Sequence, residues 1–201
     1  MIILAILVMA LGCRKATHDG GARAPNSNET KPPKLENALL EVKLGSTVKA
    51  LEQRFPTLYR HQLPMGEVLY EACDQKNLVV FSFVAEPWSP NFVTSIMVRQ
   101  EHDVGVCRDT TGGLPELGFA GATTSTVRIG DHAAVVVAKY GKPDEEQQLP
   151  DGDQVVRYRS SGKGYEPPIQ NILLVFRLHD GKVLSFTIAG DIPGAKTPFS
   201  Q

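Results

Sequence analysis

The sequence predicts an α+β fold of two tandem repeats, each a helix followed by a three-stranded antiparallel meander. The main observation is a duplicated stretch: Val42–Phe55 matches Val127–Tyr140 without a gap. Both stretches have the order apolar, basic, apolar, Gly, capping residue, and then an apolar-rich run that ends in a basic and an aromatic residue. Short alternating or β-branched runs follow each stretch, as is typical of strands. Self-similarity of this kind indicates repeated structural units.

The first helix is expected to begin after Gly45, with Ser46 as the N-cap, because its hydroxyl can accept a hydrogen bond from an unpaired backbone amide. Pro56 ends this helix, since proline cannot continue it. The apolar residues in between recur at helical spacing on one face. They are Val48, Leu51, Phe55 and Leu58.

Three strands are expected to complete the first repeat, at Glu67–Cys73, Leu78–Val84 and Phe92–Val98. Asp74–Asn77 is predicted to be the turn between the first two strands. Glu86–Asn91 contains two prolines, which keep this segment out of a β-ladder, and it is expected to be a long loop.

The second helix is harder to assign, because Val135–Val137 is β-branched and favours a strand when it is considered alone. The match to the first stretch nevertheless places Ala133, Val136 and Tyr140 at the core-facing positions of a helix. Gly141 and then Pro143 supply a helix end. The sequence therefore predicts a helix here, with Asp131 as its N-cap.

Strands are expected at Gln154–Arg159, Ile172–Leu178 and Val183–Ala189. The last two are joined by His179–Lys182, whose Asp-Gly pair suits a tight hairpin turn. The loop Ser160–Asn171 is long, whereas the corresponding loop of the first repeat is short. Unequal loops in a repeat usually lie at functional or partner-facing edges.

The N-terminus is an uninterrupted apolar run, Met1–Gly12, which ends at Cys13. At about 1.5 Å per helical residue it is too short to cross a bilayer core of about 30 Å, and it is typical of a secretory signal. The residues before Cys13 resemble the lipobox of bacterial lipoproteins, which implies that Cys13 is lipidated, with palmitate among its acyl chains, and becomes the new N-terminus. The alternatives are a Cys that follows an ordinary signal, or a short buried apolar segment.

These elements give the predicted domain boundaries. A signal peptide covers residues 1–12, a flexible tether 13–37, the first repeat 38–100, a connector 101–126, the second repeat 127–190 and a tail 191–201. The tether is rich in Gly, Pro, Asn and Ser and lacks apolar periodicity, so it cannot bury enough surface to offset the entropy of ordering.

The Gly-Asp helix start at 130–131, the Tyr140–Pro143 helix end and the meander behind a lipoprotein signal resemble the SmpA/OmlA (BamE-like) lipoprotein domain. The tandem arrangement is similar in plan to the beta-lactamase inhibitor protein. The resemblance covers roughly residues 38–190. It implies a small non-enzymatic module that binds other proteins in the bacterial envelope, lipid-anchored in the outer membrane and facing the periplasm.

Composition excludes several function classes. The formal net charge of −1 provides no basic field for nucleic acid. The five histidines show no metal-ligand spacing, so no metal is expected. The Gly162–Gly164 segment lacks the remaining residues of a phosphate-binding loop. No nucleophile, base or metal constellation indicates an enzyme, and neither a cofactor nor a small-molecule substrate is expected.

Cys73 and Cys107 are the two remaining cysteines. In an oxidising periplasm they are expected to form a disulfide, which would stabilise the fold by roughly 3–4 kcal/mol on the loop-entropy model. The alternative is two free thiols.

Trp88 and Tyr165 are the candidate partner-binding residues, since each is an aromatic in a long polar loop, as is typical of interface anchors. The alternative is that each ring folds back on the core. Two function hypotheses follow. The first is an envelope lipoprotein that acts as a protein-binding or structural module, for example in outer-membrane assembly, and the second is a secreted or anchored inhibitor of an enzyme such as a beta-lactamase or other hydrolase.

Overall fold

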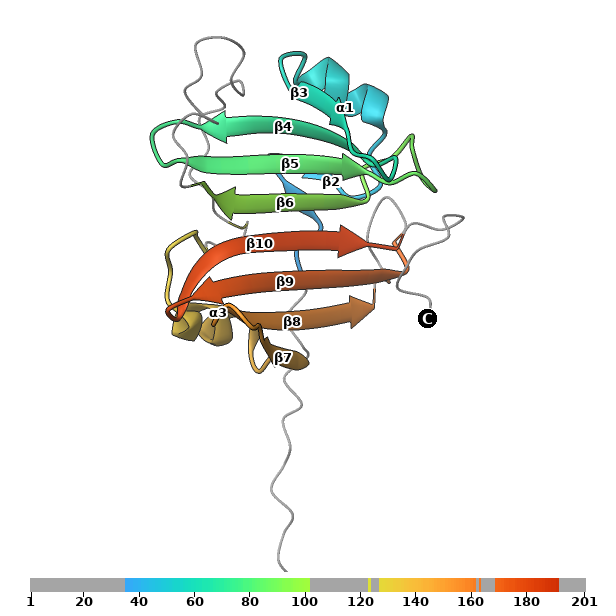
Figure 1. Cartoon of the computed structure of the whole chain (residues 1–201). Helices are drawn as coiled ribbons and strands as arrows, with labels where there is room; N and C mark the ends of the chain where they lie inside the picture. The colour runs from blue at the N-terminus through green and yellow to red at the C-terminus, as the bar shows by residue number, and fades with distance from the viewer. Residues whose placement is uncertain (1–34, 102–122, 124–126, 162, 164–168, 192–201) are drawn as a thin grey trace, which may run out of the picture. The chain divides into compact units, whose positions relative to one another are not determined.

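Eight antiparallel strands form one continuous sheet, in the order β3-β4-β5-β6-β10-β9-β8-β7 (Figure 1). The structure is a computed structural model and describes residues 35–101, 123, 127–161, 163 and 169–191, all of which belong to one compact unit, Pro32–Gln201. In chain order, the strands are β3 (Tyr59–Gln62), β4 (Val68–Asp74), β5 (Val79–Ala85), β6 (Ser95–Gln100), β7 (Glu145–Gln148), β8 (Gln154–Ser161), β9 (Asn171–His179) and β10 (Lys182–Gly190).

The predicted fold class, two helix-plus-three-stranded units, is therefore wrong. Strand β6 pairs with β10 from Ser95↔Ala189 to Arg99↔Ser185, so both halves of the chain contribute to the same sheet. Sheet edges carry unpaired N–H and C=O groups, and joining two such edges satisfies both. The apolar pattern within each half contains no information about this partner.

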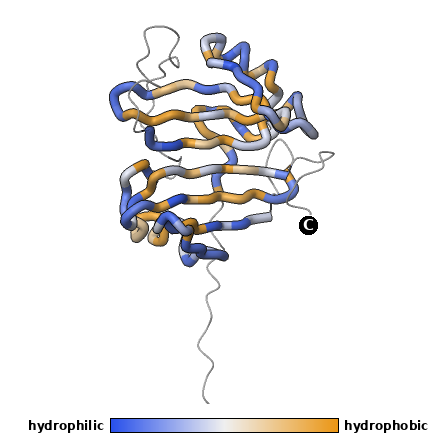
Figure 2. The backbone as a smooth tube through the Cα atoms, viewed as in Figure 1, coloured by the Kyte–Doolittle hydropathy of each residue, from blue (hydrophilic) through white to orange (hydrophobic). Residues whose placement is uncertain are grey.

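Each half also has a fourth strand that the sequence did not reveal. These are the short edge strands β3 and β7, whose sequences YRHQ and EEQQ are polar. The acidic pair Glu145–Glu146 is the start of β7. Edge strands are commonly short and charged, because this discourages pairing with other chains, and such strands lack the apolar alternation on which prediction depends. Figure 2 shows β7 as hydrophilic, while apolar residues concentrate along the central strands.

Two helices lie among the described residues, α1 (Val48–Arg54) and α3 (Ala133–Tyr140). The helical prediction for Val135–Val137 is confirmed. Val136 and Tyr140 are buried, whereas Val135 and Val137 are exposed. Packing of one helix face against the sheet outweighs the β-propensity of three consecutive valines. Neither helix in the described part of the chain is long and apolar enough to cross a membrane.

The predicted N-caps are each one residue too early. Thr47 caps α1, and its hydroxyl accepts a hydrogen bond from the Ala50 amide at 3.2 Å. Ser46 instead accepts from the Lys43 amide, and Asp131 accepts in the same way from the Arg128 amide. Both side chains therefore stabilise the turn that precedes the helix, and neither accepts a hydrogen bond from the first turn of the helix itself among the described contacts.

In both duplicated stretches the glycine before the helix donates a backbone hydrogen bond to a residue of its own half of the chain. The Gly45 amide donates to the Val93 carbonyl and the Gly130 amide to the Val183 carbonyl, each at 2.8 Å. The φ angles of these glycines are 79° and 88°, a region that residues with a Cβ rarely adopt. Gly45 thus anchors the start of α1 to the loop just before β6, and Gly130 anchors the start of α3 to β10.

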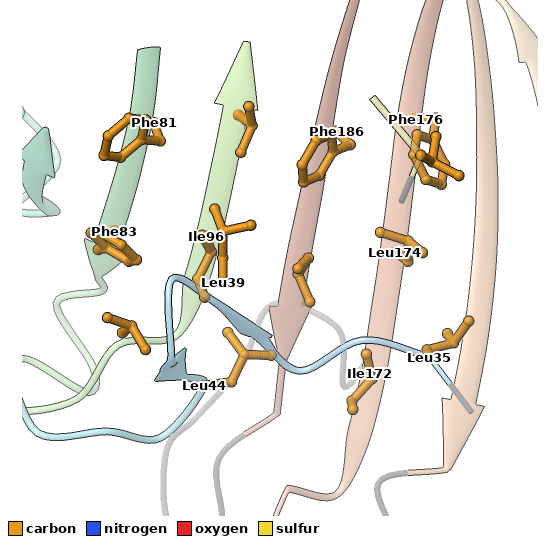
Figure 3. Close-up of a cluster of buried hydrophobic side chains, with 14 of the residues drawn as sticks. Leu35, Leu39, Leu44, Phe81, Phe83, Ile96, Ile172, Leu174, Phe176 and Phe186 are labelled. Carbon is orange, nitrogen blue, oxygen red and sulfur yellow. The ribbon is translucent and has the colours of Figure 1, made fainter. Parts of the chain in front are cut away.

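The core lies on one face of the sheet and includes an N-terminal hairpin, β1 (Ala38–Leu39) with β2 (Val42–Lys43). Figure 3 shows Leu35, Leu39 and Leu44 beside side chains of the central strands. Leu35 and Glu36, at the end of the predicted tether, are buried, and Glu36 accepts a hydrogen bond from the Tyr140 hydroxyl at 2.6 Å. Phe81, Phe186 and Phe176 lie at the same level of the sheet on β5, β10 and β9, and Phe83 lies two residues further along β5 (Figure 3).

Candidate protein-binding surface

Two loops meet at one end of the sheet. The β3–β4 turn covers residues 63–67 and the β5–β6 loop covers residues 86–94. Because β4 and β5 are antiparallel, with Val68 opposite Ala85, the start of β4 lies beside the end of β5. The two loops therefore emerge from neighbouring positions.

Backbone hydrogen bonds close both loops. In the first, the Leu63 amide donates to the Glu67 carbonyl at 2.8 Å and the Gly66 amide to the Leu63 carbonyl at 2.9 Å. In the second, the Ser89 amide donates to the Glu86 carbonyl at 2.8 Å. These internal bonds limit the conformations available to each loop, so its side chains are held in place before any partner arrives.

The loops also contact each other. Gly66 has φ 97°, and a Cβ at this position would lie 3.2 Å from Pro87 Cγ, which is closer than ordinary van der Waals contact. A residue with a side chain would need both a strained backbone and a shift of the β5–β6 loop. Gly66 thus allows the two loops to lie against one another.

Apolar side chains point outward from this loop pair. Met65 is 82% exposed and Trp88 is 38% exposed, and Leu63 and Phe92 are exposed to a similar degree as Trp88. We call these four residues the Trp88 surface. Large apolar side chains at the exposed end of rigid loops are typical of protein interfaces, where Trp and Met are enriched.

Two carboxylates adjoin the Trp88 surface. Glu67 and Glu86 each have one carboxylate oxygen that is buried and without a hydrogen-bond partner among the described residues. Burial raises the pKa of Glu86 above its usual range, and the negative charge of Glu67 raises it further. The two carboxylates therefore repel each other in the free protein.

The structure tests some aspects of the sequence-predicted site residues. Trp88 lies in the predicted loop, with part of its ring surface covered and part available to a partner. Cys73 is fully buried and disulfide-bonded. Cys13, Cys107 and Tyr165 lie outside the described residues, so lipidation, the Cys73–Cys107 pairing and the role of Tyr165 stay predictions.

Sequence reasoning missed Met65, Glu67 and Glu86 as members of this site. The signal that could have indicated Met65 is its position between Pro64 and Gly66, since an apolar residue at the tip of a turn has no core to join. The two glutamates gave no such signal, because their proximity depends on the pairing of β4 with β5.

A second polar cluster lies on the face of the sheet opposite the core, on β4, β5 and β6. The Arg99 guanidinium donates to Glu71 and to Ser82, each at 3.1 Å, and Ser82 also donates to Glu71. Ser82 is fully buried and Glu71 is almost so. Arg99 and Glu71 form an ion pair and the Ser82 hydroxyl has no access to solvent, so this cluster stabilises the sheet.

A third cluster joins the β7–β8 turn to the end of β9. The buried carboxylate of Asp153 accepts hydrogen bonds from Arg177 and from His179 Nδ1, the latter at 2.7 Å, and Arg177 also contacts Asp151. These hydrogen bonds lower the pKa of Asp153 and raise that of His179. In the part of the chain that the structure describes, no group of three or more potential ligands could hold a metal ion.

Comparison with known proteins finds no matching family model and no matching curated protein. Among solved structures, a cysteine-rich secretory protein from Staphylococcus aureus matches with 15% identity and a TM-score of 0.39, over 73% of this chain and 42% of that one. An extracellular protein with an SCP domain from Bacillus anthracis matches with 10% identity and a TM-score of 0.42, over 81% of this chain and 49% of that one. The chain thus spans less than half of each protein. TM-scores this low establish neither a shared fold nor a shared function for this chain.

Proposed function

We propose that this chain is a lipid-anchored module of the bacterial envelope that binds other envelope proteins without catalysing a reaction, and that the Trp88 surface makes the contact. The observation that carries the proposal is the exposure of Met65 and Trp88 on two loops that are hydrogen-bonded internally and in contact with each other. Exposed apolar patches with polar residues around them are typical of protein–protein interaction sites.

The rigidity of the loops supports a protein partner. Association costs entropy when side chains and loops become ordered, and a surface that is already ordered avoids much of this cost. Trp88 and Met65 supply apolar area at the centre of the surface, while the polar residues of the adjoining turns would form its rim. This is the arrangement that an interface with a few dominant residues requires.

The anchor rests on the sequence. Lipidation of Cys13 would attach the chain to a membrane without spanning it, and residues 14–34 would separate the anchor from the folded unit. Replacing this residue, Cys13→Ser, should move the protein from the membrane fraction to the soluble fraction. An unchanged distribution would exclude the anchor but leave the binding surface intact.

A second candidate function is inhibition of an enzyme by insertion of the loops into its cleft. The observation that favours it is the 82% exposure of Met65 at the tip of a tight turn, which is a shape that a concave site could accept. The two candidates differ in the partner: a component of envelope assembly in the first case and a soluble hydrolase in the second.

Affinity purification of the tagged full-length chain from solubilised envelope separates these candidates and tests the surface. The wild-type chain should recover envelope proteins, and the variant Met65→Ser/Trp88→Ala should lose them. The matched control is Val135→Ser/Val137→Ser, which removes two exposed apolar side chains from α3. Recovery of the same proteins by the Trp88 surface variant would contradict the proposal, and a soluble hydrolase as the main partner would favour the inhibitor.

A further inference from the structure

We infer that copies of this chain associate head to tail, with the β3 edge of one copy paired to the β7 edge of the next. The occupant of each sheet edge is thus a second copy of the same sheet. This self-association goes beyond the proposed function and does not depend on the Trp88 surface. Three features support it: the outward-facing backbone groups of the two edges, the even number of strands, and the opposite charges that the edges carry.

The first edge is β3, which pairs only with β4 within the described part of the chain (Figure 1). The Leu63 amide donates to the Glu67 carbonyl, which continues the β3–β4 register by one pair. Bonded and non-bonded pairs alternate in an antiparallel ladder, so the backbone groups of Arg60 and Gln62 point away from β4. Both residues are exposed, and this edge is therefore open to a further strand.

The second edge, β7, has the same construction. The Leu149 amide donates to the Asp153 carbonyl and continues the β7–β8 register. By the same alternation, the backbone groups of Glu146 and Gln148 point away from β8. Both of these residues are exposed, and β7 has four residues, as β3 has. The two edges thus match in length and in the number of backbone groups that they offer.

The even number of strands makes the two edges compatible. All eight strands pair antiparallel, so the outermost strands β3 and β7 run in opposite directions. A second copy that is shifted along the sheet, without rotation, places its β3 antiparallel to β7 of the first copy. Arg60 pairs with Tyr70 and Glu146 with Val156, and both partners belong to the core. Arg60 and Glu146 therefore lie on the same face of the joined sheet.

The two edges carry opposite charges. Arg60 donates to the Tyr70 hydroxyl at 3.3 Å, and Glu146 accepts from the Gln154 side chain at 3.1 Å. Neither Arg60 nor Glu146 forms an ion pair with another residue in the described ranges. The neighbouring Glu145 differs, because its carboxylate is paired with two arginines of β8. One positive charge on β3 and one negative charge on β7 thus remain available to another copy.

These charges select which edges can pair. Opposite charges on facing residues of adjacent strands are stabilising, and like charges are destabilising. Two β3 edges would bring Arg60 against Arg60, and two β7 edges would bring Glu146 against Glu146. The charges therefore discourage pairing of like edges, as is usual for edge strands, while unlike edges attract. Because this contact joins two different surfaces of the chain, it repeats from copy to copy and does not close at a dimer.

Sedimentation velocity of the purified full-length chain tests the inference. The mass of the wild-type particles should grow beyond a dimer as protein concentration rises, and high salt should reduce this growth because exposed charges are screened. Arg60→Glu and Glu146→Arg should each weaken association by about tenfold, since attraction across the joint becomes repulsion. An equimolar mixture of these two variants should associate as the wild type does, because each variant carries the edge charges that complement the other.

The matched control is Lys139→Glu, which makes the same change of charge as Arg60→Glu at an exposed position of α3 and should associate as the wild type does. Thermal unfolding checks that each variant is folded. A wild-type chain that stays monomeric, particles that stop at a dimer, or a mixture that associates no better than its separate components would each overturn the inference. Loss of association in Met65→Ser/Trp88→Ala, with Arg60→Glu unaffected, would assign self-association to the Trp88 surface and also overturn it.

Discussion

Trp88→Ala should weaken binding to the partner by a factor that follows from the exposed area of the ring. A Trp side chain buries about 150–250 Å² in an interface or core. Since Trp88 is 38% exposed, roughly 60–95 Å² remains for a partner to cover. At about 25 cal/mol per Å², this area corresponds to about 1.4–2.4 kcal/mol, or a tenfold to sixtyfold increase in Kd. That range is typical of a dominant interface residue.

Isothermal titration calorimetry of the purified chain with the partner recovered from the envelope measures this change. Val137→Ser is the matched control, because Val137 is 47% exposed on α3, and its Kd should stay within about twofold of the wild type. Thermal unfolding of both variants establishes that each is folded. A Kd for Trp88→Ala within twofold of the wild type, in a folded protein, would refute the assignment of Trp88 to the interface.

Three further predictions concern the fold. Phe176→Ala removes a fully buried ring that lies 6.0 Å from the ring of Phe186, and it should lower the free energy of unfolding by about 3–5 kcal/mol in chemical denaturation. Thr47→Ala removes the cap of α1 and should cost about 1 kcal/mol in the same measurement. His179→Gln should destabilise the protein most between about pH 4 and pH 6.5, because Asp153 loses its contribution as pH falls through its lowered pKa and His179 loses its contribution as pH rises through its raised pKa.

For each of these three predictions, a specific result would contradict the structural reasoning. A loss below about 1 kcal/mol for Phe176→Ala would mean that the core relaxes around the missing ring or that the ring is not buried in solution. Ser46→Ala is the control for the cap, and if it costs more than Thr47→Ala, the helix begins one residue earlier than described. A destabilisation by His179→Gln that stays constant up to about pH 9 would contradict the ion pair with Asp153.

The helices were predictable because the apolar residues on the buried face of each helix occur at matching positions in the two duplicated stretches. Leu51 and Val136 occupy matching positions, and both are buried. That correspondence identified a helix at Val135–Val137, where β-propensity alone would have given a strand. The six longer strands were predictable for a similar reason, since each has an apolar face toward the core or a run that is buried on both sides.

The continuity of the sheet was not predictable from such patterns. Pairing of β6 with β10 is a contact between residues about 90 positions apart, as in Val98↔Phe186, and the side chains on both strands would look the same beside a different neighbour. Strands β3 and β7 escaped prediction because edge strands gain little from apolar residues.

Some features of the candidate site were predictable from the sequence, and others were not. Trp88 was predictable, because an aromatic in a Pro-rich loop is visible in the sequence. The Gly66–Pro87 contact and the apposition of Glu67 with Glu86 were not, since they depend on the register of β4 against β5. A shift of that register by one residue would move the glutamates apart and turn every side chain of the strand to the other face.

The most direct test of the account is site-specific photo-crosslinking in cells. A benzoylphenylalanine at Met65, in the full-length chain, should give a covalent adduct with a partner protein upon irradiation, because this residue is 82% exposed at the centre of the proposed contact. The same group at Val137, which is 47% exposed on α3, should give no such adduct. An adduct from Val137 and none from Met65 would contradict the assignment of protein binding to the Trp88 surface.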